Sequence, residues 1–324
     1  MDATPGGLPL PLLCALEAAR RRYQGFPNVL GVAAGFKFCG GRRVARAAVQ
    51  FFVGRKSERP ARRLPRFVLG RDRRGRILRR MRIPTDVIPT RPLRFACGAG
   101  SRLYAQGERG SLTLLFRDRS LPGAAGEGRG SFYLLTCAHV VGDLERSPPL
   151  SSEIRLAQRP AARPFARVLK NSRAEKGVVE HDVALARVVP QALPVRELEI
   201  EGGGHLSGWL DPEDLELGME LEMSAASGRS RGALQSLAGE FLVRLDGHLY
   251  RVRNLFGLSA PAREGDSGGL VHARGRAAGM VVARSPGGFA WWQPLRPALD
   301  HLNRSSPRTG VEPFGKDQGR GRRQ

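Results

Sequence analysis

The stretch that decides the fold reads Glu-Gly-Asp-Ser-Gly-Gly-Leu and spans residues 264–270. Glycines on both sides of Ser267 permit a tight turn that exposes the hydroxyl and directs successive backbone N–H groups into one concavity. At this content of glycine, aspartate and serine, the pentapeptide at residues 265–269 is expected by chance in about one chain in a thousand. Because such a pentapeptide alone is usually a simple turn, its meaning depends on partners elsewhere in the chain.

Two further fragments supply the partners that a serine nucleophile needs. Residues 135–141 read Leu-Thr-Cys-Ala-His-Val-Val, and residues 181–186 read His-Asp-Val-Ala-Leu-Ala. His139 ends an apolar strand and Asp182 begins another, so an imidazole and a carboxylate can lie together at the rim of a β-core. A hydroxyl attacks a carbonyl when a base accepts its proton, a carboxylate orients the base and N–H donors hold the oxyanion. Singly, each residue is more often structural; as a set, they predict acyl transfer.

The three fragments resemble the motifs of trypsin-like (chymotrypsin-clan) serine proteases. The chain order His, Asp, Ser separates this clan from subtilisin-like and α/β-hydrolase enzymes. The spacings of 43 and 85 residues between His139, Asp182 and Ser267 suit the family, and the resemblance covers about residues 95–302. It implies a mainly β fold of two packed six-stranded antiparallel β-barrels. His139 and Asp182 would belong to the first barrel and Ser267 to the second, with the substrate cleft between them.

The resemblance also implies roles for these residues. Ser267 would attack the scissile carbonyl, His139 would accept its proton and return it to the leaving amine, and Asp182 would orient His139. The backbone N–H groups of Gly265 and Ser267 would hold the oxyanion. We therefore expect a serine endopeptidase of the bacterial type that acts on a peptide or protein through an acyl-enzyme intermediate, with no metal and no organic cofactor.

The chain departs from the animal enzymes of this family at three points. Val140 follows the histidine and Cys137 precedes it, so the disulfide formed there by a cysteine after the histidine is absent. No activation sequence of the Arg-Ile-Val-Gly-Gly type precedes the barrel, and Asp266 therefore has no evident new N-terminus to pair with. The position six residues before Ser267, acidic in enzymes that cut after basic residues, is Pro261. Trypsin-like specificity is not expected.

The same alignment places three further residues at the primary substrate pocket. They are Val282, Ala283 and Arg284. Two small or medium apolar side chains and one cation describe a modest pocket with a positive edge. We expect it to favour small, apolar or acidic side chains.

The rest of the sequence predicts a small α+β N-terminal region followed by short strands. A helix is expected over residues 8–22 and a β-hairpin over residues 28–53. Residues 55–82 hold 13 basic and 2 acidic side chains with interspersed proline and glycine, which predicts a loosely structured basic connector. Eleven short strands separated by turns are expected between residues 111 and 292, and a closing helix over 294–302.

Three regions follow from this pattern. Residues 1–94 form the N-terminal helix, hairpin and connector, residues 95–302 form the protease-like double barrel, and residues 303–324 form a basic tail that we expect to be disordered. Residues 1–95 contribute +17 to the net charge of +23, whereas residues 96–302 contribute only +2. A uniform coding bias towards arginine does not explain this distribution.

The uneven charge supports an alternative function. In this alternative, the chain is a catalytically weak or inactive chymotrypsin-fold binding or scaffold protein. The basic segment at residues 55–82 would hold it, or an active protease, on nucleic acid or an acidic protein.

The sequence predicts neither a membrane span nor a metal site, and it gives only a general indication of the cellular compartment. No run of about 18 apolar residues is present, so no membrane span is expected. The N-terminus lacks the features of a signal peptide, and four cysteines at irregular spacing give neither a zinc pattern nor a disulfide scaffold. We therefore expect a cytoplasmic protein. His205, His248, His272 and His301 lack partners at ligand spacing, and His181 is expected to face solvent.

Overall fold

The computed structural model covers the 324-residue chain. It describes residues 9–39, 42–56, 62–72, 74, 76–90, 93–95, 102–105, 108–118, 131–142, 144, 152–156, 164–189, 198–200, 204–245, 248–285, 289–305 and 311–314.

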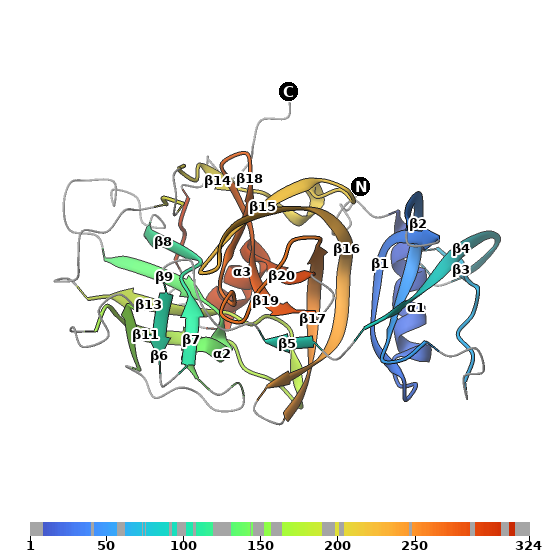
Figure 1. Cartoon of the computed structure of the whole chain (residues 1–324), viewed down its shortest axis with the longest axis horizontal. Coiled ribbons are helices and arrows are strands. Elements are labelled where there is room, and N and C mark those ends of the chain that lie inside the picture. The colour runs from blue at the N-terminus through green and yellow to red at the C-terminus, as the bar shows by residue number, and fades with distance from the viewer. Residues whose placement is uncertain are drawn as a thin grey trace.

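The N-terminal region, called the leader below, is one helix packed on two hairpins (Figure 1). Its elements are α1 (Leu10–Tyr23), β1 (Val29–Cys39), β2 (Arg42–Val53), β3 (Phe67–Arg71) and β4 (Ile77–Pro89). Strands β1 and β2 are antiparallel, which confirms the expected hairpin, and β4 runs parallel to β2. The helix buries a stripe of four side chains at helical spacing, namely Leu12, Ala15, Leu16 and Ala19.

The expectation of a loosely structured connector over residues 55–82 was wrong in its second half. Strands β3 and β4 form an antiparallel hairpin there. Charge is compatible with a strand because side chains alternate between its faces: Ile83 and Thr85 are buried while Arg82 is exposed. The Arg82 guanidinium lies 4.8 Å from the centre of the Phe67 ring and covers part of this exposed aromatic side chain.

The first barrel closes through one bent segment. Its strands are β6 (Arg102–Ala105), β7 (Glu108–Ser111), β8 (Leu114–Arg117), β9 (Phe132–Thr136), β10 (Glu153–Leu156), β11 (Ala166–Asn171) and β13 (Ala184–Val188). They pair in the order β7-β6-β10-β11-β13-β9-β8. Because β7 and β8 stand at opposite ends of this order but are two residues apart in the chain, the sheet curls into a barrel of six strand positions.

The second barrel closes by direct pairing. Its strands are β15 (Glu220–Ala225), β16 (Gly228–Leu245), β17 (His248–Leu258), β18 (Leu270–Ala273), β19 (Arg276–Arg284) and β20 (Ala290–Pro294). They pair in the order β17-β20-β19-β18-β15-β16, and β16 pairs with β17 to complete the ring. The fold is therefore mainly β, with two antiparallel barrels of the chymotrypsin-like type, as expected.

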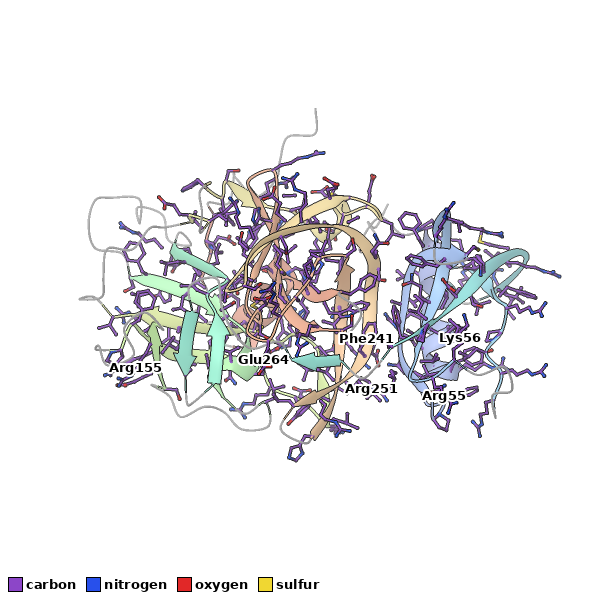
Figure 2. All side chains as sticks on the ribbon, in the orientation of Figure 1. Arg55, Lys56, Arg155, Phe241, Arg251 and Glu264 are labelled. Atoms are coloured by element: carbon purple, nitrogen blue, oxygen red, sulfur yellow. The ribbon has the colours of Figure 1, made fainter. Side chains whose placement is uncertain are left out.

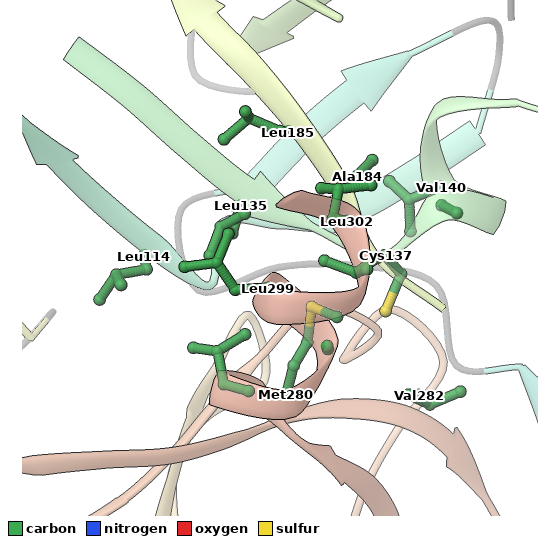
Figure 3. Packing of buried hydrophobic residues seen from close by; sticks show 14 of the residues in the cluster. Leu114, Leu135, Cys137, Val140, Ala184, Leu185, Met280, Val282, Leu299 and Leu302 are labelled. Carbon is green, nitrogen blue, oxygen red and sulfur yellow. The ribbon is translucent and has the colours of Figure 1, made fainter. Parts of the chain in front are cut away.

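Short elements complete the chain. They are β5 (Leu93–Phe95), α2 (Ala138–Val141), β12 (Val178–Val179), β14 (Gly208–Trp209), a 3-10 turn at Pro212–Asp214 and the closing helix α3 (Leu295–Ser305). Helix α3 packs against both barrels, because Leu299 and Leu302 lie in one apolar cluster with Leu135 of β9 and Met280 of β19 (Figure 3). The helix thus joins the two barrels.

The leader shares a sheet and a core with the second barrel. Strand β1 pairs antiparallel with β16, with Gly31 opposite Phe241. A Cβ atom at Gly31 would lie 2.2 Å from the Phe241 ring, so glycine permits this close approach. The Phe52 ring of the leader packs 5.0 Å from Phe241 and 5.4 Å from Trp291, measured between ring centres. The boundary at residues 94 and 95 stays a prediction, and it separates segments that pack together.

The expectation of a disordered tail was wrong for residues 311–314. Val311 and Phe314 are buried, and the Phe314 ring meets the Trp209 ring edge-on at 4.7 Å. The Trp209 indole N–H also donates to the Glu312 carboxylate. The prediction of disorder was based on the basic composition of the tail and overlooked its two apolar side chains, Val311 and Phe314. Residues 306–310 and 315–324 lie outside the described residues.

Within the part of the chain that the structure describes, no helix has both the length and the apolar character needed to cross a membrane.

Candidate active site

Ser267 lies on a tight turn just before β18. Gly265 and Gly268 have φ angles of +108° and +86°, in the left-handed region that favours glycine. The turn is tied to the first barrel by two hydrogen bonds: the Ser111 N–H donates to the Ser267 carbonyl at 2.8 Å, and the Thr113 hydroxyl donates to the Gly268 carbonyl at 2.6 Å. The second barrel therefore presents Ser267 at its contact with the first.

His139 and Asp182 meet because their strands are neighbours in the first barrel. Strand β9 ends just before His139, Asp182 precedes β13, and β9 pairs with β13 so that Thr136 is opposite Ala184. The His139 backbone N–H donates to one carboxylate oxygen of Asp182 at 3.1 Å. The other carboxylate oxygen accepts from the His139 ring at Nδ1. Two contacts to one carboxylate fix both the position and the rotation of the ring.

The second ring nitrogen of His139 faces the serine hydroxyl. Nε2 of His139 lies 2.9 Å from Oγ of Ser267. Since Nδ1–H donates to Asp182, the neutral imidazole has a free lone pair on Nε2 that can accept the Ser267 proton. The Ser267 hydroxyl also lies 3.1 Å from the Val282 carbonyl, a second acceptor for the same hydrogen. The three residues expected from the sequence are thus brought into one hydrogen-bonded series.

This series is almost completely shielded from water. Asp182 and Ser267 have no exposed surface, and His139 is 2% exposed. The buried Asp182 is further held by its backbone N–H, which donates to the Gln293 side chain at 2.8 Å. In such a low-dielectric setting the His139–Asp182 contact is stronger than it would be in water.

Asp266 has partners that the sequence did not reveal. Its carboxylate is buried and accepts the Ser227 backbone N–H at 3.1 Å, the Ser227 hydroxyl at 2.8 Å and the Arg263 backbone N–H at 2.7 Å. These donors fix the residue between Gly265 and Ser267 without a new N-terminus. Ser227 precedes Asp266 by 39 residues, and no spacing rule in the sequence connects the two.

The four residues expected at the substrate pocket differ in burial and in their contact with Ser267. Val282 and Ala283 are buried on β19, and the Val282 carbonyl reaches Ser267, whereas Pro261 is exposed. Arg284 is half-buried, with its guanidinium 4.0 Å from the Glu264 carboxylate. Figure 2 shows Glu264 on the part of the molecule that holds the barrels, well apart from Arg55 and Lys56 of the leader. A carboxylate thus offsets the cationic edge; the specificity itself stays a prediction.

One group of three metal-ligating side chains occurs among the described residues. Donor atoms of Cys137, His139 and Asp182 all lie within 4.8 Å of one another. Two of these side chains are bonded to each other, and the Cys137 thiol donates to the Val281 carbonyl at 3.2 Å. These donor atoms therefore serve contacts within the protein.

His181 does not face solvent, and that expectation was wrong. Its side chain is buried, and its ring lies 5.3 Å from the His301 ring of α3, measured between centres. Burial, together with the smaller effects of the neighbouring His301 and Arg304, lowers the pKa of His181 to about 4. His181 is therefore neutral at pH 7 and places no charge beside Asp182.

Two closed barrels with a His–Asp–Ser series at their junction define the chymotrypsin-like fold of serine proteases. No family model matches the chain, and no curated protein matches it.

Solved bacterial serine proteases of the chymotrypsin fold are similar to the chain at low identity. One is a glutamic-acid-specific serine protease that uses a histidine triad in substrate binding, with 17% identity over 62% of this chain and 95% of that chain and a TM-score of 0.45. Thermobifida fusca protease A has 19% identity over 64% and 95%, with a TM-score of 0.42. The α-lytic protease homologue N4 has 18% identity over 64% and 96%, with a TM-score of 0.45. The fold class rests on the strand pairing.

Proposed function

We propose that the protein is a serine endopeptidase that hydrolyses peptide bonds through an acyl-enzyme intermediate. The observation that carries the proposal is the hydrogen-bonded series from Asp182 through His139 to Ser267. Ser267 attacks the scissile carbonyl as its proton passes to Nε2 of His139. The proton then moves to the leaving amine, and water releases the acyl group by the same path in reverse.

The oxyanion is assigned to the backbone N–H groups of Gly265 and Ser267. Support comes from the positive φ of Gly265 and from the three donors that fix Asp266 between these two residues. Donors that are fixed before the reaction stabilise the developing charge without reorganisation. We infer that this turn needs no proteolytic trimming to form.

A chymotrypsin-fold binding protein without activity is the second candidate. The observation that favours it is the absence of exposed surface on Ser267, since a nucleophile must be reached by its substrate. In either case the basic leader would hold the protein on a polyanion; exposed arginines at positions 74, 76 and 82 support this part of the proposal. A cytoplasmic location, expected from the sequence, is proposed with it.

A fluorophosphonate probe distinguishes the two candidates. It forms a covalent bond only with a serine that an adjacent base activates. We expect one adduct per chain by intact mass at pH 8, none in Ser267→Ala, and an unchanged adduct in Ser207→Ala, which alters an exposed serine that bonds to Gly275 and not to the series. Labelling that persists in Ser267→Ala would overturn the assignment of the nucleophile.

The leader's attraction to polyanions has a separate test. Binding of the full chain to non-specific duplex DNA should weaken steeply between about 50 and 200 mM salt, because phosphate contacts release counterions. Replacement of Arg74, Arg76 and Arg82 by glutamine should reduce the slope. A slope that these changes leave untouched would place the contact elsewhere.

A further inference from the structure

The stretch that leads into Asp182 is held by the second barrel, although it lies between β11 and β13 of the first barrel in the sequence. Strand β12 pairs parallel with β17 of the second barrel, with Val179 opposite Val252. By Ala184 the chain has crossed to the first barrel, where β13 pairs with β9. Asp182 therefore lies where the chain passes from one barrel to the other.

One glutamine of the second barrel links this stretch to β17. Gln293 is on β20 and has no exposed surface. Its Oε1 accepts the Asp182 backbone N–H at 2.8 Å, and its Nε2 donates to the carbonyls of Glu180 at 3.2 Å and of Arg253 at 2.8 Å. Because a backbone N–H can only donate and a carbonyl can only accept, these partners fix which end of the amide faces Asp182. The acceptor and both donors of the amide are thus in use.

The same stretch is also anchored by side chains of β17. The Arg253 guanidinium pairs with the Glu180 carboxylate, and the Asn254 amide donates to the Glu180 carbonyl at 3.3 Å. Asn254 has a φ of +56°, a left-handed conformation that asparagine adopts more readily than most residues. Strands β17 and β20 are paired neighbours in the second barrel (Figure 1), so all these contacts tie the approach to Asp182 to one sheet.

The nucleophile belongs to this second barrel as well. Ser267 lies on the turn before β18, and β18, β19 and β20 are consecutive in the strand order. The pairing of β9 with β13 brings His139 beside Asp182, but it does not set the distance from His139 to a serine on the other barrel. That distance is 2.9 Å between Nε2 and Oγ, and it requires that Asp182 be fixed relative to the second barrel.

We propose that Gln293 is a positioning residue that fixes Asp182 relative to the barrel that carries Ser267. This inference rests on the proposed function. The three hydrogen bonds of Gln293 act on the reaction only through the position of Asp182. A displaced Asp182 would rotate the His139 ring through the two contacts that its carboxylate makes, and Nε2 would no longer be aligned with the Ser267 hydroxyl.

The first measurement is the rate at which a fluorophosphonate acylates Ser267 at pH 8. Gln293→Met keeps about the same side-chain length and volume but removes the amide acceptor and both amide donors. The rate should fall about 10- to 100-fold, because small displacements of the reacting groups are costly.

A second buried glutamine of the chain provides the matched control. Gln50 of the leader is 1% exposed, its Oε1 accepts the Ser236 hydroxyl at 2.7 Å and its Nε2 donates to the Phe36 carbonyl at 2.8 Å. Gln50→Met removes the same chemical groups at a site that has no bond to the stretch before Asp182. It should lower the melting temperature as Gln293→Met does, while the acylation rate stays close to that of the unmodified chain.

The second measurement reports on the His139–Asp182 contact without any reaction. The proton on Nδ1 of His139 is held by a buried carboxylate and should give a low-field proton NMR resonance, which His139→Gln identifies by its loss. The resonance should move or broaden in Gln293→Met and stay in place in Gln50→Met. A residue with only a structural role would leave it in place in both.

The outcomes decide the inference in each case. It is overturned if folded Gln293→Met keeps both the acylation rate and the resonance, or if Gln50→Met loses as much rate. If Gln293→Met does not fold, Gln293→Asn takes its place, since it keeps the amide on a side chain one methylene shorter. A severalfold slower rate with a displaced resonance then supports the inference, and unchanged values overturn it. If the unmodified chain takes no label, the proposed function fails, and the resonance alone decides whether Gln293 positions Asp182.

Discussion

The two barrels hold their shares of the site by different means. In the first barrel, His139 and Asp182 are neighbours because β9 and β13 pair in the barrel wall. In the second barrel, Ser267 is on a turn whose shape depends on a few polar contacts, chiefly those of Asp266 with Ser227 and Arg263. The comparison teaches that the orientation of the base follows from strand register, whereas that of the nucleophile depends on individual hydrogen bonds.

The largest expected effect is on the first-barrel side. Asp182→Asn keeps the shape of the side chain but removes the carboxylate that fixes the His139 tautomer, so the rate of peptide hydrolysis should fall about 10⁴-fold. The measurement is kcat/KM together with the melting temperature. Asp214→Asn, at a surface aspartate, is the control that should change neither by much. A variant that retains most of its activity would show that strand register alone orients His139.

The second effect concerns the free energy of unfolding and comes from His181, the residue next to Asp182. His181 has a folded pKa of about 4 against an ordinary value of 6.5, so the unfolded chain binds the proton more readily. The free energy of unfolding should therefore be unaffected by this group above pH 6.5 and should fall as the pH decreases from 6.5 to 4. The full loss is about 3 kcal/mol. Urea titrations of the unmodified chain and His181→Gln should show a smaller loss in the variant; equal losses would exclude His181 as the cause.

The third effect tests the polar contacts of the second barrel. Ser227→Ala removes a hydroxyl donor to the Asp266 carboxylate, an interaction of about 1.5–3 kcal/mol. The rate of Ser267 acylation should fall roughly 10- to 100-fold if this contact positions the turn, and Ser227→Thr should restore most of it. A lower melting temperature with an unchanged acylation rate would limit Ser227 to a structural role.

The smallest effect is expected at the junction of the barrels. Thr113→Val removes the hydroxyl donor to the Gly268 carbonyl and should destabilise the protein by about 1 kcal/mol. The acylation rate should fall only severalfold, because the Ser111 N–H still holds the Ser267 carbonyl. A loss as large as that of Ser227→Ala would mean that the first barrel, too, controls the nucleophile.

The sequence predicted what depends on local pattern. The motifs around His139, Asp182 and Ser267 could be recognised because each is a short string, and the β1–β2 hairpin followed from alternation and a glycine turn. The geometry of the series then depends on the pairing between β9 and β13. This pairing brings His139 and Asp182, which are 43 positions apart in the sequence, within hydrogen-bonding distance.

The features that the sequence did not predict depend on contacts across long separations. The Ser227 donors to Asp266 belong to a different hairpin from the turn that carries Ser267. Phe314 packs against Trp209, which is more than a hundred positions away in the sequence. The β3–β4 hairpin was missed because its charge suggested a loop, although one face of β4 carries the buried Ile83 and Thr85. The density of charged residues alone does not distinguish a solvated loop from a strand with one solvent-exposed face.

The pairing of β1 with β16 cannot form until most of the chain has been synthesised. Gly31 is made early, but its partner Phe241 emerges about 210 residues later. At roughly 5–20 residues per second, the N-terminal hairpin must wait about 10–40 s on the ribosome for that partner. Its unpaired β1 edge is meanwhile open to other strands, a hazard for any slow, long-range sheet. Newly made chains should therefore depend on chaperones more than either barrel alone would require.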